Sequence, residues 1–258
     1  MKIALALVTN RHLLTPWWAP RVRATLAHFD GDACFIWVDS SYRGCVNVMA
    51  DADTLGLVSS TKHPVLRLQV GDTPNPCGVM RNHAIALARA QDCDAFVFVD
   101  DDDWWDPCLL ERLASAPSHM PALRDDLWLY LRVVGKHATS VVSLDHSRWA
   151  PLSNTRTRVM LPGTLLNLRC RVPMPDFDSG RACSDVRMLR NWRTRFEGWC
   201  PGLGVPNDTV HYVAVRHSEN TGNTHPIVGS DRRPPFAQAL PQVAADPAWR
   251  TLQRLLQP

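Results

Sequence analysis

Short apolar runs recur through the first half of the chain, and polar or turn-forming residues bound each of them. These runs cover residues 3–8, 34–38, 65–70 and 95–99. Their length and their β-branched or aromatic content are typical of buried strands in a parallel sheet. Between them, residues 20–29 and 79–90 have the length and apolar spacing of helices that pack on a sheet. This alternation predicts a parallel α/β sheet with right-handed crossovers.

The second half of the chain is less regular. Further strands are predicted over residues 127–134, 139–144, 163–170 and 210–215, the first two compatible with a hairpin across Gly135-Lys136. Helices are predicted over residues 184–196 and, in the tail, 249–256. No repeat or linker separates the halves, so the sequence predicts one domain over residues 1–225, divided near residue 115, and a C-terminal tail over residues 226–258.

The most informative stretch is residues 95–107, AFVFVDDDDWWDP. Its apolar run passes directly into four aspartates at residues 100–103, which Trp104 and Trp105 follow. The pair Asp106-Pro107 then predicts a helix start, because Asp caps free N–H groups and Pro fits the first helical position. The carboxyl ends of strands are where open α/β sheets bind ligands, so we expect these carboxylates in a ligand site.

Adjacent carboxylates repel one another, and a bound divalent cation would offset that repulsion. Mg²⁺ and Mn²⁺ prefer carboxylate oxygens and bridge to the phosphate oxygens of a substrate. The alternative is a solvated acidic turn, which is what most acidic runs are. The direct succession of the acids on a fully apolar strand favours the metal–phosphate interpretation.

Charge is unevenly spread along the chain. Residues 1–130 hold 11 Lys+Arg against 16 Asp+Glu, whereas residues 131–258 hold 17 against 9. An acidic half suited to a cation is thus followed by an Arg-rich half suited to phosphates or an anionic acceptor. The alternative is that Arg simply replaces Lys, because Lys2, Lys62 and Lys136 are the only lysines.

The 8 cysteines form no CxxC pair. This scatter predicts free thiols in a reducing compartment rather than a zinc site or a disulfide framework. No apolar run is long enough for a membrane span, and residues 3–8 lack a signal-peptide cleavage pattern. We therefore expect a soluble cytoplasmic protein.

Taken in order, these features resemble the GT-A glycosyltransferases of family 2. The helix start Arg81-Asn82, the apolar strand, the Asp-rich DxD motif and the Pro-opened helix follow that family's pattern. The other matching pieces are Thr9-Asn10-Arg11, Asp39-Ser40-Ser41, Gly163-Thr164 and Ser184-Asp185. The resemblance covers roughly residues 1–225 and departs from the family at Ser184, where a glutamate is usual.

The resemblance implies a Rossmann-like GT-A fold of the α/β class, with a mostly parallel central sheet flanked by helices. Residues 1–115 would form the nucleotide-sugar half, and residues 116–225 the acceptor and catalytic-base half. The implied enzyme is a metal-dependent inverting transferase, with a UDP-sugar favoured as donor. The chemistry is consistent, because a metal stabilises the departing diphosphate while a carboxylate on the opposite face takes the acceptor's proton.

Candidate metal ligands follow from this resemblance. Asp100 and Asp102 match the DxD pair, with Asp102 as the direct ligand of Mn²⁺ or Mg²⁺. His217 ends an apolar strand and is a further candidate, since imidazole suits Mn²⁺, although an ordinary surface or core histidine is the alternative. His211 and His225 are less favoured substitutes.

Donor binding is assigned to Thr9, Asn10, Arg11, Asp39, Arg81, Asp100 and Asp101. The guanidinium of Arg81 suits a diphosphate oxygen, with a surface salt bridge as the alternative. The order of the family's segments implies Asp185 as the general base, and a helix N-terminus would favour its ionised carboxylate. A purely structural helix-start role is the alternative for Asp185, and Asp176 and Asp178 are its rivals.

Asp103, Trp104 and Trp105 are assigned to the acceptor side. Asp103 serves the acceptor or caps local structure, while one of the two indoles stacks on a sugar or base and the other is core. Trp17 and Trp18 are interpreted as loop residues that line the same cleft or simply pack.

The acceptor is left open between a glycan, a protein and modified DNA. Two other function classes compete with glycosyl transfer. A Mg²⁺-dependent nucleotidyl or phosphoryl transferase also gathers aspartates, but the chain has no Walker loop or Gly-rich phosphate cradle. A catalytically silent relative that binds carbohydrate or nucleic acid is the third class.

Overall fold

The structure is a computed structural model of the chain. It describes residues 1–9, 12–39, 56, 61–70, 76–115, 130–131, 133–134, 139–144, 148–151, 162–169, 177, 203–204, 210–217 and 235–257.

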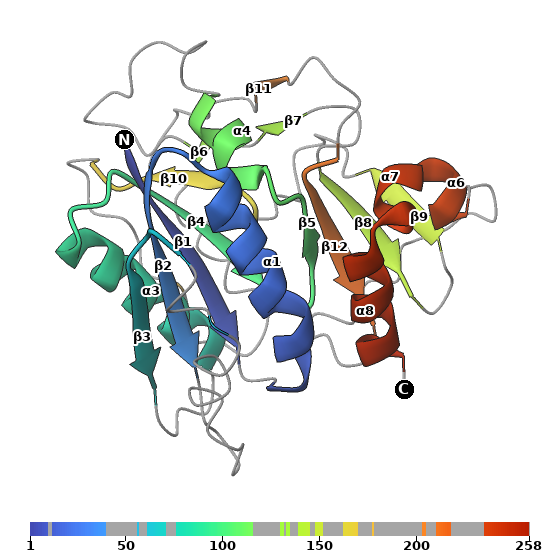
Figure 1. Ribbon diagram of the computed structural model, residues 1–258, viewed down its shortest axis with the longest axis horizontal. Coiled ribbons are helices and arrows are strands. Elements are labelled where there is room, and N and C mark those ends of the chain that lie inside the picture. The colour runs from blue at the N-terminus through green and yellow to red at the C-terminus, as the bar shows by residue number, and fades with distance from the viewer. Residues whose placement is uncertain are drawn as a thin grey trace.

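A six-stranded sheet forms the centre of the molecule, in the order β3-β2-β1-β4-β10-β6 (Figure 1). Its strands are β1 (Lys2–Thr9), β2 (Asp32–Asp39), β3 (Val65–Gln69), β4 (Ala95–Asp100), β10 (Leu165–Asn167) and β6 (Tyr130–Leu131). The first four are parallel to one another, and β10 is antiparallel to both of its neighbours. The expected strands of the first half and the mostly parallel sheet are therefore confirmed.

Alternating side chains of β1 and its neighbours build two cores, one on each face of the sheet. Ile3, Leu5 and Leu7 belong to one core, whereas Ala4 and Ala6 belong to the other. The helices whose side chains join the first core include α1 (Thr15–His28), α4 (Leu109–Ser115) and α8 (Pro247–Leu256). The second core lies against α3 (Pro76–Ala90). Both faces of the sheet are thus covered, which explains why its strands are apolar throughout.

A second sheet lies beside the first, in the order β5-β12-β8-β9 (Figure 1). Its strands are β5 (Trp104–Trp105), β12 (Tyr212–Arg216), β8 (Thr139–Ser143) and β9 (Arg148–Pro151). Strand β12 is antiparallel to β5 and parallel to β8. Because β5 follows directly on the four aspartates, this pairing brings the end of β12 to the acidic stretch.

The suggested hairpin across Gly135-Lys136 is wrong. Within the described residues, β6 pairs with β10, β7 (Val133–Val134) pairs with β11 (Leu203–Gly204), and β8 pairs with β12 and β9. Strand β8 is thus paired on both of its edges, with β12 and with β9, which leaves no edge for β7.

The C-terminal helices α6 (Phe236–Ala239), α7 (Pro241–Ala245) and α8 lie beside β8, β9 and β12 (Figure 1). Phe236, Val243 and Trp249 are buried in the same core as α1. The helix expected in the tail is confirmed and begins two residues earlier, at Pro247, with the Asp246 side chain accepting a hydrogen bond from the Ala248 N–H.

The first helix begins earlier than predicted. A single 3₁₀ turn, η1 (His12–Leu14), leads into α1, which starts at Thr15 and contains Pro20. Trp17 and Trp18 therefore lie in a helix rather than in a loop, and both are buried. Their packing in the core corrects the expectation of a loop that lines the cleft.

Among the described cysteines, Cys34, Cys93 and Cys108 are free thiols, in agreement with the expectation. The described part of the chain contains no helix of the length and apolarity that crossing a bilayer requires.

Candidate functional site

The carboxyl ends of three neighbouring strands place polar side chains at one edge of the central sheet. Thr9 ends β1, Asp39 ends β2 and Asp100 ends β4. In the parallel register, Thr9 lies opposite Asp39, and Val8 lies opposite Asp100. Thr9 and Asp39 are buried, so the two predicted donor-binding residues line the same edge as the aspartates.

The four aspartates form a tight turn between β4 and β5, here called the acidic turn (residues 100–103). The Asp103 N–H donates to the Asp100 carbonyl over 3.2 Å, which closes the turn. Carboxylate oxygens of Asp100, Asp102 and Asp103 all lie within 4.8 Å of one another. Asp101, Asp102 and Asp103 are buried, whereas Asp100 is partly exposed. The repulsion predicted from the sequence is therefore concentrated in a small volume away from water.

Arg81 compensates one of these charges. It lies near the start of α3, and its guanidinium donates to Asp100 Oδ1 over 2.8 Å. The guanidinium carbon also lies 4.4 Å from the centre of the Phe98 ring and 5.6 Å from that of Phe177. Arg81 is 5% exposed and Asp100 is partly exposed, so this is a partly buried ion pair rather than the surface salt bridge considered as the alternative. Contact of Arg81 with a donor diphosphate stays a prediction.

Asp101 is joined to the end of β1. The Thr9 hydroxyl donates to Asp101 Oδ2 over 2.5 Å, and Asp101 is 1% exposed. The expected role of both residues in donor binding stays a prediction, but the structure brings them together at the sheet edge.

Asp102 and His217 meet at the centre of the site. His217 follows the end of β12, and its Nε2 atom lies 2.9 Å from Asp102 Oδ2. Both side chains are buried. The sequence predicts these two residues as metal ligands, although 115 positions separate them, and the structure places them in direct contact.

Asp103 is bonded to β12 through both of its carboxylate oxygens. Oδ2 accepts from the Tyr212 hydroxyl over 2.6 Å, and Oδ1 accepts from the Val215 N–H over 2.8 Å. Burial, and then the nearby charges of Asp102 and Asp100, raise the pKa of Asp103 well above its usual range. Of the two roles predicted for Asp103, these bonds support capping of local structure.

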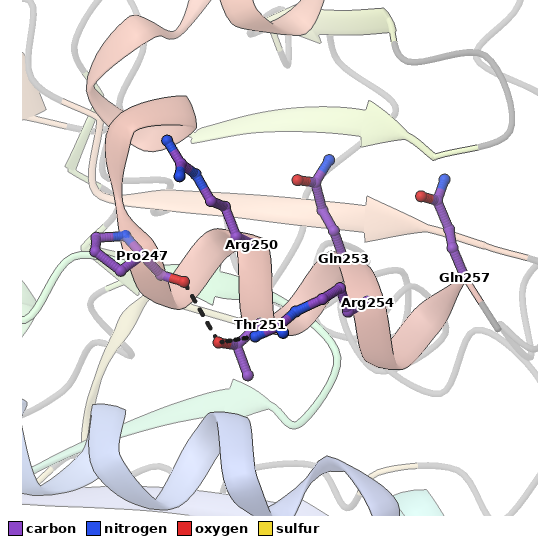
Figure 2. A pocket seen from close by; sticks show the side chains of 6 residues that line it. All are labelled: Pro247, Arg250, Thr251, Gln253, Arg254 and Gln257. Atoms are coloured by element: carbon purple, nitrogen blue, oxygen red, sulfur yellow. Dashed lines mark hydrogen bonds between the residues drawn. The ribbon is translucent and has the colours of Figure 1, made fainter.

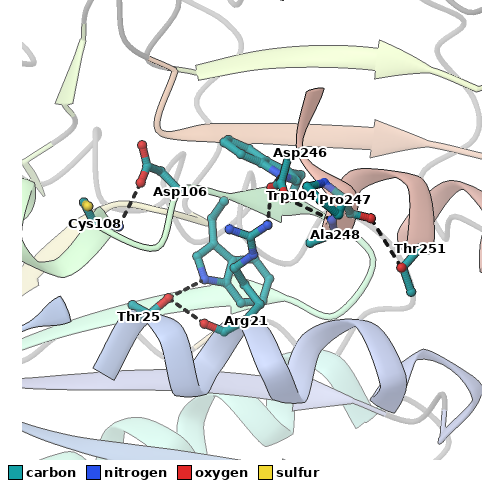
Figure 3. Close-up of polar contacts among 10 residues, drawn as sticks. Arg21, Thr25, Trp104, Asp106, Cys108, Asp246, Pro247, Ala248 and Thr251 are labelled. Atoms are coloured by element: carbon teal, nitrogen blue, oxygen red, sulfur yellow. Dashed lines mark hydrogen bonds and ion pairs between the residues drawn. The ribbon is translucent and has the colours of Figure 1, made fainter. Parts of the chain in front are cut away.

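Trp104 and Trp105 lie in the core, contrary to the expectation that one of them stacks on a sugar. Trp104 Nε1 donates to Asp246 Oδ2 over 2.8 Å, next to the ion pair between Asp246 and Arg21 (Figure 3). Trp105 Nε1 donates to the Thr25 hydroxyl over 3.1 Å. The two indoles are 5% and 0% exposed, because α1 and the C-terminal segment cover them. They connect the acidic turn to the protein's first core instead.

His211, the substitute metal ligand, points elsewhere. Its backbone carbonyl accepts from the Asp106 N–H, while its ring is buried and neither ring nitrogen has a hydrogen-bond partner. Burial, and then the charge of Arg112, lower the pKa of His211 to about 4. Among the described residues, the cluster of acidic side chains that could hold a metal ion does not include His211.

Several predicted site residues lie outside the described residues. They are Asn10, Arg11, Asp185, its rivals Asp176 and Asp178, and His225. Their predicted roles stay predictions.

Two residues that matter to the site are missing from the sequence-based prediction. Tyr212 contacts Asp103 and Asp100, yet it is embedded in the apolar strand YVAVR and resembles a core residue. Asp246 holds Trp104 and Arg21, and the Asp-Pro pair that caps α8 is its only sequence signal.

A hollow of about 690 Å³ lies along the exposed side of α8 and is separate from the acidic turn (Figure 2). Its lining residues are Pro247, Arg250, Thr251, Gln253, Arg254 and Gln257. None of them belongs to the sheet edge described above.

The donor set of the acidic turn fits a hard divalent cation. Carboxylate oxygens within 4.8 Å of one another, with an imidazole beside one of them, are ligands that Mn²⁺ and Mg²⁺ accept. Arg81 pairs with the partly exposed Asp100, and the buried carboxylates of Asp102 and Asp103 lie beside it, so a cation would lower the repulsion among these groups.

No protein-family model and no curated protein matches this chain. Solved structures match it at low identity. Residues 1–349 of S. aureus TarS give a TM-score of 0.54 at 15% identity, over 83% of this chain and 60% of that one. The same part of TarS with UDP-GlcNAc gives 0.53 at 13% identity, over 99% and 70%. With UDP it gives 0.52 at 14% identity, over 84% and 61%.

This chain thus spans about three fifths of the length of the first TarS structure. At such identities the likeness concerns the fold. Together with the mostly parallel sheet covered on both faces, it confirms the expected α/β fold of the GT-A type.

Proposed function

We propose that this protein is a metal-dependent glycosyltransferase that moves a sugar from a nucleoside-diphosphate sugar to an acceptor hydroxyl, with inversion at the anomeric carbon. The observation that carries the proposal is the cluster of carboxylates in the acidic turn, together with the contact of its Asp102 with His217. A UDP-sugar is the favoured donor, which is in keeping with a fold shared with structures that hold UDP-GlcNAc and UDP.

Asp102 and His217 would hold Mn²⁺ or Mg²⁺, with Asp100 as the next ligand. A divalent ion there supplies positive charge beside the diphosphate as it departs. Arg81 restrains Asp100 through its 2.8 Å ion pair, so that carboxylate keeps a fixed direction. Thr9 and Asp39, at the ends of β1 and β2, would bind the nucleoside part of the donor, and Thr9 also orients Asp101.

The acceptor hydroxyl must lose its proton as it attacks the anomeric carbon from the face opposite the diphosphate. We assign this proton to the carboxylate of Asp185, on the strength of its place in the family order. Asp185→Asn should keep donor binding and lose turnover, and near-normal turnover of that variant would exclude the assignment.

Binding of UDP in the presence and absence of Mn²⁺ tests the donor site directly. By thermal shift, UDP should stabilise the wild-type protein with Mn²⁺ and much less without it. Asp102→Asn should lose this Mn²⁺-dependent part, because it removes a charged ligand. Asp30→Asn is the matched control, since Asp30 is a fully exposed carboxylate far along the chain from the acidic turn, and it should respond as the wild type does.

The reaction itself is tested by incubation with a panel of nucleotide sugars and Mn²⁺. Release of the nucleoside diphosphate is the expected result. Release of pyrophosphate or phosphate would favour the nucleotidyl or phosphoryl transferase, and Mn²⁺-dependent UDP binding with no turnover on any donor and acceptor would favour a silent relative. Equal UDP stabilisation of the wild type and Asp102→Asn would contradict the proposed site.

A further inference from the structure

Tyr212 lies in β12 at the point where this strand pairs with β5. Its side chain is 1% exposed, and its hydroxyl makes two hydrogen bonds at once. It donates to Asp103 Oδ2 over 2.6 Å and accepts from the Asp100 N–H over 3.2 Å. One hydroxyl therefore holds both the first and the last residue of the acidic turn.

The same strand carries the other half of the candidate metal site. The Val215 N–H, three residues after Tyr212, binds the second carboxylate oxygen of Asp103 over 2.8 Å. His217 then follows the end of the strand and contacts Asp102. Besides the bonds from Thr9 and Arg81, the acidic turn is therefore bonded directly to the strand that His217 follows.

The Tyr212 ring packs against Gly163. The Gly163 N–H donates to the Phe98 carbonyl over 2.8 Å, so the glycine lies against β4, just before the acidic turn. A Cβ atom at residue 163 would lie 2.7 Å from Cδ2 of the Tyr212 ring. Because Gly163 has no side chain, the Tyr212 ring can contact its backbone while the hydroxyl bonds to the acidic turn.

We propose that Tyr212 is a positioning residue for the metal and diphosphate site: its hydroxyl sets the acidic turn so that Asp102 faces His217. This inference rests on the proposed function. Groups that orient a metal ligand from behind contribute to metal affinity although they never touch the metal. Packing alone does not require the hydroxyl, since phenylalanine would fill the same space.

Asp103 connects Tyr212 to the rest of the acidic turn. Both of its oxygens already accept hydrogen bonds from β12, so its carboxylate transmits the position of Tyr212 to the turn. The competing possibility is that Asp103 itself ligates the cation, because its oxygen lies within 4.8 Å of those of Asp100 and Asp102. If Asp103 only transmits the position of Tyr212, metal affinity depends on the Tyr212 hydroxyl. If Asp103 is simply a ligand, metal affinity does not require that hydroxyl.

The test is Mn²⁺ affinity of the full-length protein in the presence of UDP, measured from the electron paramagnetic resonance signal of free Mn²⁺. Tyr212→Phe should weaken Mn²⁺ binding by roughly tenfold to a hundredfold, the range found for residues that support metal ligands. Thr25→Val is the matched control, because Thr25 also has a buried hydroxyl with two bonds, to Trp105 Nε1 and the Arg21 carbonyl. This control should bind Mn²⁺ as the wild type does.

Asp103→Asn provides the second variant, and circular dichroism verifies that each variant folds. A similar loss of Mn²⁺ affinity in Asp103→Asn and Tyr212→Phe supports positioning through one hydrogen bond. Wild-type affinity in Tyr212→Phe overturns the inference, whether or not Asp103→Asn loses the metal, while leaving the proposed function intact. Absence of Mn²⁺ binding in the wild type would instead refute the proposed function itself.

Discussion

Gly163 offers a quantitative test of how tightly the Tyr212 ring is held. Its φ of +73° lies in the left-handed region, which costs an alanine about 1–2 kcal/mol. The alanine Cβ would also lie 2.7 Å from Cδ2, 2.9 Å from Cγ and 3.1 Å from Cβ of Tyr212. The ring is buried and bonded at its hydroxyl, so it cannot move away, and such overpacking costs about 1–3 kcal/mol.

Gly163→Ala should therefore lower the free energy of unfolding by about 2–5 kcal/mol. At about 2–4 °C per kcal/mol for a protein of this size, the Tm should fall by roughly 4–20 °C. Urea denaturation followed by tryptophan fluorescence measures the first quantity, and calorimetry measures the second. The variant should also lose Mn²⁺ affinity, because a displaced ring carries its hydroxyl away from Asp103.

Gly31→Ala is the matched control for this experiment. A Cβ at Gly31 would lie even closer to its neighbour, 2.4 Å from Cζ of Phe29, but that atom is the far end of a ring, and the backbone of Gly31 is not left-handed. The Phe29 ring has no hydroxyl that fixes its position, and Gly31 lacks the cost of a left-handed backbone, so the loss should be smaller than for Gly163→Ala. A Gly163→Ala variant within about 0.5 kcal/mol of the wild type, the range of a neutral surface substitution, would refute the reasoning.

Two further predictions concern groups away from the acidic turn. His211 has a pKa of about 4 when folded against 6.5 when unfolded, so acid protonates the unfolded chain first, and stability should fall as the pH drops from about 6.5 to 4. The part due to His211 is roughly 3 kcal/mol at most, and His211→Phe should remove that part of the slope in denaturation curves taken across this range; an unchanged slope would contradict the prediction. Asp246→Ala should destabilise the protein by about 3–5 kcal/mol in urea, because it leaves the buried Arg21 charge unpaired. Asp30→Ala, which breaks the exposed pair with Lys62, should cause no measurable change, and equal losses in the two variants would show that burial does not matter here.

The parallel strands could be predicted from the sequence because burial on both faces leaves a simple mark, an uninterrupted apolar run. Asp102 and His217 could each be picked out as a candidate ligand because each closely follows an apolar strand. Such arguments require only local patterns and the rules of parallel sheets. The contact of Asp102 with His217 could not be predicted in this way, because β4 and β12 belong to different sheets and the pairing of β5 with β12 brings the two residues together.

The burial of Trp104 and Trp105 could not be predicted from the sequence. Trp104 follows the acids, and its position in the sequence suits a ligand site, but the α8 cap that buries it, Asp246, comes 142 residues later. An indole is equally suited to a sugar and to a core, so only the long-range contact decides. Tyr212 was missed because it lies in an apolar strand, and the sequence does not indicate that its hydroxyl makes a hydrogen bond.

During synthesis, the residues that complete the candidate site are made long after the acidic turn. Strand β1 is made first yet stands inside the sheet, so it must wait for β4 before both of its edges are paired. The acids emerge next, and their partners on β12 follow only after a further 109 to 115 residues. On a ribosome that adds about 5–20 residues each second, the nascent chain therefore carries this cluster of like charges unassembled for several seconds. A cation that bound these carboxylates during that interval would lower their mutual repulsion before β12 is made.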